Sequence, residues 1–223
     1  MTEDQGNLWK GNLQFFGKAT ASISHEIKNT LAIIAESAGL LEDLILMSEK
    51  GMELKSGQLQ EISQRIQRQS VRADLIVKRL NAFSHSSDEL LRSIDLLELV
   101  QMVLPLAQRF SLLRGVTLEM IPDSKNVSIT TDPFSLENLL WRSLDFAAAR
   151  ADSNKSLLIN VDEDANGGRI EISGMKNLSS LSEANFPGRE ERMLIGHLKA
   201  SFLSEEQMGR IFICLPRELD RVS

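Results

Sequence analysis

A histidine followed directly by a glutamate stands in the segment Ser24-His25-Glu26-Ile27-Lys28-Asn29. A neutral imidazole nitrogen can attack a phosphoryl group as a nucleophile, and an adjacent carboxylate can hydrogen-bond the other ring nitrogen and so fix its tautomer. Asn29 follows His25 by one helical turn, which places both residues on one helix face. An imidazole beside a carboxylate is an arrangement that can do nucleophilic chemistry, so His25 is a candidate reactive residue. The alternative is a surface histidine without a chemical role.

The element that must position His25 is a long amphipathic helix, predicted over residues 8–48. Its apolar or small residues recur in steps of three and four, as in a helix packed lengthwise against others. His25 lies off this stripe, about 200° round the helix from Ile23 at roughly 100° per residue. We therefore expect the imidazole ring to face away from the core. The stripe consists of Phe16, Thr20, Ile23, Ile27, Leu31, Ile34, Ala38, Leu41 and Ile45.

A second helix is predicted over residues 59–83, after helix-breaking residues at 49–51 and 56–57. The two helices form an antiparallel hairpin, and two helices with one apolar stripe each cannot close a core alone. We therefore predict a homodimer in which two hairpins form a four-helix bundle. Gln69 in the second stripe either fixes the register of the bundle or faces a wet gap. The second stripe consists of Leu59, Ile62, Ile66, Gln69, Ala73, Ile76, Leu80 and Phe83.

The order Ser-His-Glu-Ile-Lys-Asn, followed by Leu31, resembles the phosphoacceptor box of the sensor histidine kinases, Ser-His-Glu-(Leu or Ile)-(Arg or Lys)-(Thr or Asn)-Pro-Leu. The resemblance implies that His25 is the phosphoacceptor and that Glu26 orients or activates it. It also implies that Asn29 orients an attacking water during dephosphorylation of a partner. Thr30 stands where the family has Pro, so we expect a straighter helix near His25.

The same resemblance implies a partner, the receiver domain of a response regulator, whose aspartate must approach His25. We expect the receiver to contact the outward helix face just after His25, at Lys28, Asn29, Ala32 and Ala35. The two small side chains leave room for close approach, although alanines on an exposed helix are also ordinary helix formers.

Two basic features lie on the second helix. Arg65, Arg68 and Arg72 share one helix face, which is either a solvated surface that balances acidic neighbours or a phosphate site. His85 lies in a polar run near the helix end, where a histidine suits the helix dipole. No partner motif surrounds His85, so we do not expect a second phosphoacceptor there.

Residues 93–223 change to a pattern of alternating strands and helices, which predicts an α+β domain with a mixed sheet covered by helices on one face. We expect a hairpin domain at residues 1–92 and this second domain at 93–223. Asp132-Pro133 marks a helix start, because Asp caps a helix and Pro fits its first turn. Helices are expected up to about residue 113 and over 134–151 and 190–198, and strands over 116–120, 126–131, 157–161, 169–173, 200–203 and 210–215.

This order of elements resembles the ATP-binding domain of the same kinases, an α/β sandwich. The resemblance is carried by Ile94-Asp95-Leu96, by Asp132-Pro133 and by the ending Gly209-Arg210-Ile211-Phe212-Ile213-Cys214-Leu215-Pro216. The family's nucleotide helix carries Asn-Leu-x-x-Asn-Ala, whose Asn side chains hold Mg²⁺ and phosphate. Aligned from Asp132, these positions are Arg142 and Phe146. Neither a guanidinium nor a phenyl ring can replace an oxygen ligand of a hard cation.

Two further ATP-binding motifs of the family are missing. Where the family has Asp-x-Gly-x-Gly, the chain reads Ser173-Gly174-Met175-Lys176-Asn177, without an acid and with one glycine. The second glycine-rich motif is replaced by Asn185-Phe186-Pro187-Gly188-Arg189. The loss of three motifs predicts a degenerate domain that does not bind ATP in the usual way, with no cofactor and no metal.

Composition narrows the class of protein further. The chain has 223 residues, of which 42% are hydrophobic, and a net charge of −6, which argues against binding to nucleic acid. Its single cysteine, Cys214, cannot form a disulfide or a Cys-based metal site within one chain. We expect no membrane segment and no signal peptide, and hence a cytoplasmic protein.

Three functions remain open from the sequence. The first is a phosphotransferase in which His25 exchanges a phosphoryl group with receiver aspartates and needs no ATP. The second is an interaction module of the pseudokinase type that dimerises and sequesters a receiver. The third is a divergent active kinase, or the core fragment of one, so the enzymatic class stays open. Glu26 and Asn29 favour the first function, because a scaffold needs neither residue.

Overall fold

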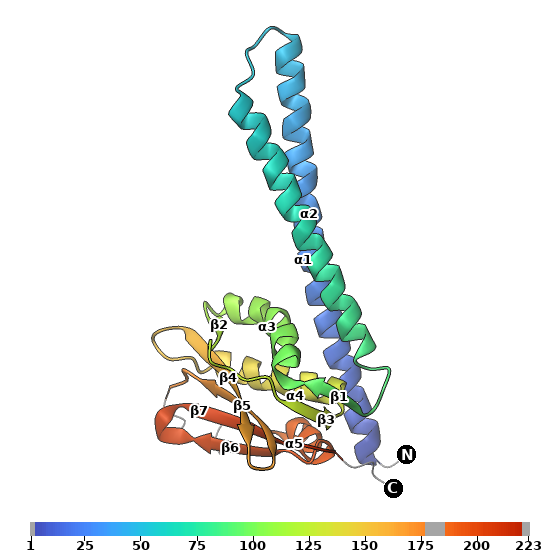
Figure 1. Cartoon of the computed structure of the whole chain (residues 1–223), viewed down its shortest axis with the longest axis vertical. Helices are drawn as coiled ribbons and strands as arrows, with labels where there is room; N and C mark the ends of the chain where they lie inside the picture. The colour runs from blue at the N-terminus through green and yellow to red at the C-terminus, as the bar shows by residue number, and fades with distance from the viewer. Residues whose placement is uncertain (1–2, 177–185, 220–223) are drawn as a thin grey trace. The chain divides into compact units, whose positions relative to one another are not determined.

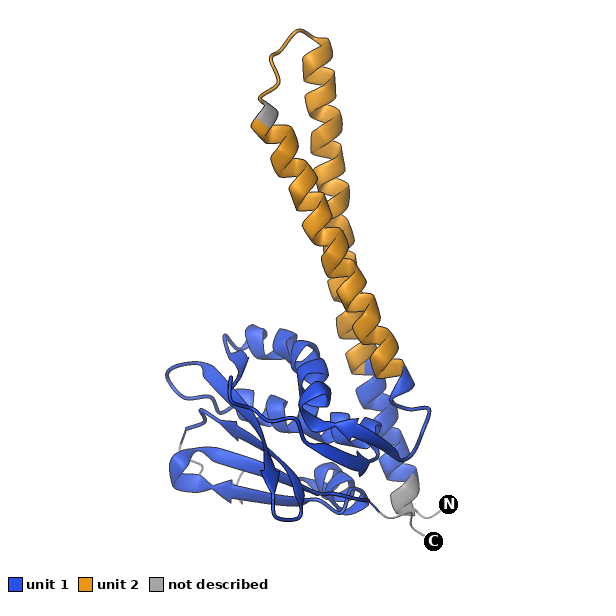
Figure 2. Cartoon of the chain, in the orientation of Figure 1, with its two compact units in different colours: residues 1–17, 85–223 blue, residues 18–84 orange. Residues whose placement is uncertain are grey.

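The computed structural model describes residues 3–176 and 186–219, so Asn177 and Asn185 of the altered motifs lie outside the described residues. The chain divides into two compact units (Figure 2). One unit is Lys18–Ser84, and the other combines Met1–Gly17 with His85–Ser223. The first helix therefore contributes its opening turns to the unit that contains the sheet. The predicted domain boundary after residue 92 stays a prediction.

The unit Lys18–Ser84 is a helical hairpin, as predicted (Figure 1). Helix α1 spans Glu3–Glu49 and α2 spans Ser56–His85. Gly51 ends α1 with a φ of 83°, a left-handed conformation that glycine adopts without strain. The amide of Met52 donates to the carbonyl of Met47 and that of Gly51 to Ser48, which satisfies the last carbonyls of the helix.

The hairpin buries only part of the apolar stripes in the single chain. Ile23 and Ile76 are buried, whereas Leu31 and Ile45 of the predicted stripe are 53% and 49% exposed. The buried side of α1 also contains small polar residues, among them Thr30 and Ser37. Their hydroxyls donate to backbone carbonyls one turn earlier, and the bond from Ser37 to Ile33 measures 2.7 Å. Several apolar side chains of the hairpin thus remain exposed in the single chain, of which Leu31 and Ile45 belong to the predicted stripe. They are Leu31, Leu40, Ile45, Leu46, Val71, Leu75 and Val77.

The second unit contains a five-stranded mixed sheet in the order β2-β4-β5-β7-β6. Its strands are β2 (Thr117–Met120), β4 (Ser156–Asp164), β5 (Gly167–Ser173), β6 (Ser201–Glu205) and β7 (Arg210–Pro216). Only β2 and β4 pair in parallel. The alternation of apolar residues places Ile159, Ile172 and Ile211 on one buried face, because they are opposite each other in the register. Cys214 lies half-buried on β7.

A separate sheet consists of two antiparallel strands, β1 (Arg92–Asp95) and β3 (Ser128–Thr131), each of which directly precedes a helix of this unit. The sequence pattern did not predict β1, because the apolar run from Ile94 continues directly into a helix. Asp95 ends the strand and caps that helix, since its carboxylate accepts from the amide of Leu97 at 2.8 Å.

Helices α3 (Leu96–Leu113), α4 (Pro133–Ala148) and α5 (Arg189–His197) complete the unit, with a short 3₁₀ turn at Glu206–Met208. Among the described residues, α3 is the one helix long and apolar enough to cross a membrane, by length and composition alone. This evidence is weak, because Glu98 and Arg109 interrupt its apolar run and one side of it is buried in the domain core. The mixed α+β architecture agrees with the prediction.

Candidate functional site

His25 lies exposed on α1, as its position off the apolar stripe predicted. Among the described residues, none forms a hydrogen bond with its ring. Both imidazole nitrogens are therefore open to a reaction partner. The site residues Lys28, Asn29, Ala32 and Ala35 are also exposed on α1.

Glu26 faces the second helix of the hairpin. Its Oε1 lies 3.6 Å from Nη2 of Arg72 on α2, and its side chain is 32% exposed. The carboxylate that was expected to contact the His25 ring is thus held by a cation from α2. Sequence reasoning noticed Arg72 as part of a basic face but could not show which acid it pairs with, because the pairing depends on the register of the two helices.

Thr30, which replaces the proline of the kinase box, donates a hydrogen bond from Oγ1 to the carbonyl of Glu26 at 2.9 Å. A proline here would have removed the amide that bonds this same carbonyl. Threonine instead adds a second donor to it, and α1 runs without a break through the phosphoacceptor box. The backbone of Glu26 is therefore held more firmly than in the usual box.

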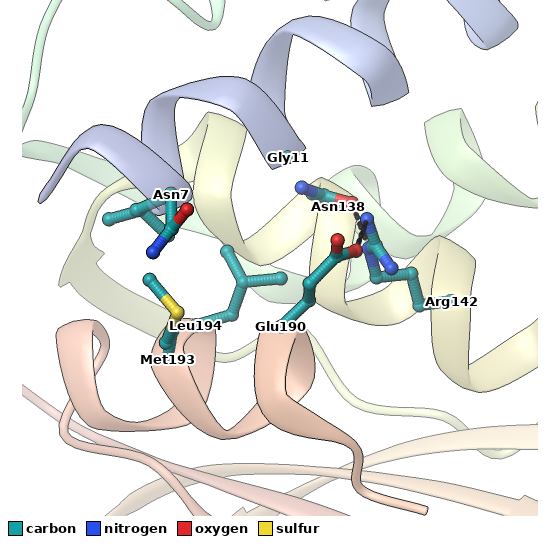
Figure 3. A pocket seen from close by; sticks show the side chains of 8 residues that line it. Asn7, Gly11, Asn138, Arg142, Glu190, Met193 and Leu194 are labelled. Atoms are coloured by element: carbon teal, nitrogen blue, oxygen red, sulfur yellow. Dashed lines mark hydrogen bonds and ion pairs between the residues drawn. The ribbon is translucent and has the colours of Figure 1, made fainter. Parts of the chain in front are cut away.

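The second candidate region is the face of α4, the helix that the sequence resemblance aligned with the nucleotide helix of the kinases. Asp132 caps α4 by accepting from the amide of Ser135 at 3.1 Å, as the Asp-Pro signal predicted. Arg142 reaches across to α5, where its guanidinium lies 2.5 Å from Glu190 (Figure 3) and 3.0 Å from Glu191. The side chains of Arg142 and Glu191 are 16% and 12% exposed, so their ion pair is shielded from water, whereas Glu190 is 51% exposed.

The opening turns of α1 pack on the same face of α4. Asn138 donates to Oδ1 of Asn12 at 2.7 Å, and Arg142 donates from Nε to the side-chain oxygen of Asn138 at 2.9 Å. Figure 3 shows Asn7 and Gly11 of α1 above these residues and α5 below them. The cavity left among them measures about 10 Å³, which is room for one water at most.

The motif Asn-Leu-x-x-Asn-Ala also fits the chain in another register, Asn138-Leu139-Leu140-Trp141-Arg142-Ser143. In this register the first asparagine is kept and Arg142 replaces the second. The sequence analysis missed Asn138 because it aligned the motif from Asp132. Alignment of the motif in neighbouring registers would have identified Asn138. In either register Arg142 occupies a position where the family has an asparagine.

Phe146 stands at the far end of α4 in an aromatic cluster. Its ring stacks on Phe186 with a centroid distance of 4.0 Å and an interplanar angle of 13°. The guanidinium carbon of Arg150 lies 4.0 Å from the same ring, and Phe202 of β6 meets Phe186 edge-on at 5.4 Å. Side chains of the domain itself thus cover α4 along much of its exposed length.

A larger cleft, of about 780 Å³, lies between the opening turns of α1 and the start of α4. Its apolar wall includes Trp9 and Phe134. The carboxylate of Asp132 in its wall is already bonded, to the hydroxyl of Ser135 at 2.7 Å and to Nε2 of His197 at 2.8 Å. The cleft therefore offers apolar surface rather than a set of uncommitted polar ligands. Among the described residues, no group of three or more His, Cys, Asp or Glu could hold a metal ion.

His85 lies exposed at the end of α2, with Nδ1 at 2.7 Å from the carboxylate of Asp88. The two side chains are 73% and 62% exposed, so this ion pair is weak. The contact is local, three residues along the chain, as expected for a helix end.

Comparison with known proteins agrees with the sequence pattern around His25. Residues 17–89 match the family of the His Kinase A (phospho-acceptor) domain. No curated protein matches the sequence at a significant level. The segment that matches the phosphoacceptor domain contains His25, Glu26 and Asn29. This part of the predicted resemblance to a sensor histidine kinase core is confirmed.

Solved structures that resemble the chain are also histidine kinases. The histidine kinase AdeS of Acinetobacter baumannii matches with a TM-score of 0.48 and 14% identity over 81% of this chain and 95% of its own. The catalytic domain of histidine kinase ThkA matches with a TM-score of 0.49 and 14% identity, over 58% of this chain and 99% of its own. ThkA in complex with the response regulator TrrA matches with a TM-score of 0.47 and 16% identity, over 92% of this chain and 63% of its own.

Proposed function

We propose that this protein is a histidine phosphotransferase of the two-component type. His25 accepts a phosphoryl group from the aspartyl phosphate of one receiver domain and passes it to the aspartate of another, without using ATP. One observation carries the proposal: the phosphoacceptor histidine is exposed, while the helix that would hold the nucleotide is covered by the chain's own side chains. We place the reaction in the cytoplasm, together with its receivers.

The reaction balances without a cofactor. The lone pair of an unprotonated ring nitrogen of His25 attacks phosphorus, so that an N–P bond forms and the bond to the aspartyl oxygen breaks. The carboxylate leaves with that electron pair, and the imidazolium loses the proton of its other nitrogen to water. The reverse sequence on a second receiver completes the transfer. Because an acyl phosphate is a high-energy donor, loading of His25 needs no nucleotide.

The packing on α4 supports the absence of ATP chemistry. A nucleotide that bound there would have to displace Glu190 and Glu191 from Arg142, which leaves charges without partners in a poorly hydrated site. It would also have to displace Asn12 and the opening turns of α1 from Asn138. Mg²⁺ prefers oxygen ligands, and the Arg142 guanidinium would repel it.

The exposed apolar face of the hairpin supports a homodimer. Leu31 and Ile45 of the predicted stripe are 53% and 49% exposed in the single chain. Full burial of a large apolar side chain is worth roughly 1.5 to 3 kcal/mol. Pairing of two hairpins into a four-helix bundle would remove this face from water, as in the bundles that such helices commonly form.

The first test compares two phosphoryl donors on one preparation of the full chain. Incubation with radiolabelled Mg-ATP is expected to leave the protein unlabelled, and calorimetry is expected to detect no Mg-ATP binding. A panel of receiver domains from the source genome, each phosphorylated with acetyl phosphate, is expected to contain at least one that transfers label to the protein. An active histidine kinase serves as the positive control for the ATP assay.

The other two functions make different predictions in the same assay. Robust labelling from Mg-ATP would contradict the proposal and indicate a divergent active kinase. Stable binding of a phosphorylated receiver without any transfer of label would also contradict it and indicate a module that sequesters receivers.

A further inference from the structure

The surface next to His25 is bounded by two ion pairs between the helices of the hairpin. On α1, His25, Asn29, Ala32 and Glu36 follow one another at the spacing of one helix face. Glu36 pairs with Arg65 of α2 at 2.9 Å, and Glu26 lies 3.6 Å from Arg72. These contacts fix which residues of α2 border the His25 face.

Arg68 lies between these two ion pairs on α2 and shares the helix face of Arg65 and Arg72. Interpolation between the two pairs places Arg68 level with Ala32 on α1. The methyl group of Ala32 can neither accept a hydrogen bond nor balance a charge. Arg68 is exposed, and in the part of the chain that the structure describes it has no ion-pair partner. The basic face of α2 thus consists of two neutralised arginines and one uncompensated arginine.

We propose that Arg68 is a docking residue for the receiver domain, and that its guanidinium pairs with a carboxylate on the receiver surface beside the reacting aspartate. This inference rests on the proposed function and names a residue that determines receiver affinity. Arginine suits the role because its planar fork can bind a carboxylate with two parallel hydrogen bonds. The small side chain of Ala32 leaves this fork accessible to a bound protein.

The distance between Arg68 and His25 along the hairpin predicts a role for Arg68 in docking and not in the chemical step. Ala32 follows His25 by seven residues, a rise of about 10 Å along an α-helix. A guanidinium at that level contacts the protein surface that surrounds the reacting aspartate rather than the phosphoryl group itself. Loss of Arg68 should therefore weaken receiver binding and leave the rate of the bound complex unchanged.

The acidic character of the partner follows from the charges around Arg68. Of the three arginines Arg65, Arg68 and Arg72, the outer two have carboxylate partners, so the uncompensated charge of this group lies at Arg68. The whole chain carries a net charge of −6, which disfavours a polyanion such as nucleic acid as the occupant of this surface. A single carboxylate on a folded protein fits a single cation.

The experiment measures receiver-dependent phosphorylation of the full chain with the most rapidly transferring receiver of the panel. Arg68→Ala is expected to raise KM about tenfold, the order of effect of one interfacial charge pair, with kcat unchanged. Arg68→Lys is expected to recover part of the affinity, because the ammonium keeps the charge but not the bidentate geometry. The difference between wild type and Arg68→Ala should shrink at high salt.

Lys78→Ala is the matched control, because Lys78 is an exposed cation of α2 that already has a carboxylate partner, Asp74 at 2.8 Å. It should leave KM within twofold of wild type. An unchanged KM in Arg68→Ala, or an equal rise in KM for Lys78→Ala, would overturn the proposal. A fall in kcat at constant KM would also overturn it, since that result indicates a role in the chemical step.

The same experiments distinguish failure of the proposed phosphotransferase function from failure of the docking role of Arg68. If wild type takes label from none of the receivers, the phosphotransferase function fails, and calorimetry with the unphosphorylated receivers decides the role of Arg68. Binding to wild type that weakens about tenfold in Arg68→Ala would then still support the docking role. Equal binding by both proteins, binding of nucleic acid at this surface instead, or binding of no receiver would refute it.

Discussion

Glu137 on α4 is an acid that the fold keeps away from water. The residue is 1% exposed, and its Oε2 accepts a hydrogen bond from the hydroxyl of Ser86 at 2.8 Å. Burial raises the pKa of Glu137 to about 8, and the nearby Asp132 adds to the rise while the Ser86 hydrogen bond opposes it. A buried carboxyl that stays protonated at neutral pH can join the segment after α2 to α4 without an unpaired charge.

This pKa predicts a pH-dependent stability. The ordinary value is 4.5, so between pH 4.5 and about 8 the native protein holds a proton that the unfolded chain releases. The free energy of unfolding should therefore fall as the pH rises through this window, by roughly 1.4 kcal/mol per pH unit at most. Glu137→Gln, which is neutral throughout, should lose this decline in denaturant titrations between pH 5 and 8.

The control for this measurement is Glu61→Gln, an exposed residue of α2. Its stability should follow the wild-type pH profile. Parallel profiles of wild type and Glu137→Gln would show that Glu137 does not carry the buried proton.

At the scale of elements, the apolar face of the hairpin determines assembly. Leu31 of the predicted stripe on α1 is 53% exposed in the single chain, so a change there should leave the hairpin itself intact. Leu31→Asp would place a charge in the interface of the proposed four-helix bundle, and desolvation of that charge should convert the dimer to a monomer. Light scattering at micromolar concentration measures this directly.

Leu158→Asp is the matched control for assembly, since Leu158 is an apolar residue of the sheet with 41% exposure. This variant should stay dimeric, and Ile66→Asp on α2 should become monomeric like Leu31→Asp. A monomeric wild-type protein would refute the bundle.

The helices and strands also show which structural elements local sequence patterns can predict. Helical periodicity predicted α1 and α2, and the Asp-Pro signal predicted the start of α4, because both depend on residues close together in the chain. Strand β1 was missed because its four residues run directly into the apolar pattern of α3. The packing of Asn12 against Asn138 was not predicted, because a contact across 126 residues leaves no local signal.

The candidate site likewise contains features that the sequence predicted and features that only the structure shows. The position and exposure of His25 followed from its place in the box and off the apolar stripe. The pairing of Glu26 with Arg72 and the uncompensated charge of Arg68 depend on the register between α1 and α2. The pairing of Arg142 with Glu190 and Glu191 depends on the fold of the second unit. Substitution in the motif indicated a lost nucleotide ligand, but only the structure identified what replaced it.

At the scale of the whole molecule, the chain combines an exposed His25 with an α+β domain in which side chains of the same chain cover the helix α4. In the proposed function, the exposed ring of His25 is available to a partner protein. The contacts of Asn12 and Arg142 occupy the face of α4 that the sequence resemblance aligned with a nucleotide-binding helix. The combination predicts a protein that relays phosphoryl groups instead of generating them from ATP.

The most direct test of this account measures transfer from a phosphorylated receiver to wild type and to His25→Gln in parallel. Wild type should gain an acid-labile, base-stable phosphoryl group that mass spectrometry locates on His25. His25→Gln should bind the receiver with nearly unchanged affinity and gain no label. Equal labelling of His25→Gln, or a phosphoryl group located at another residue of the wild type, would contradict the account.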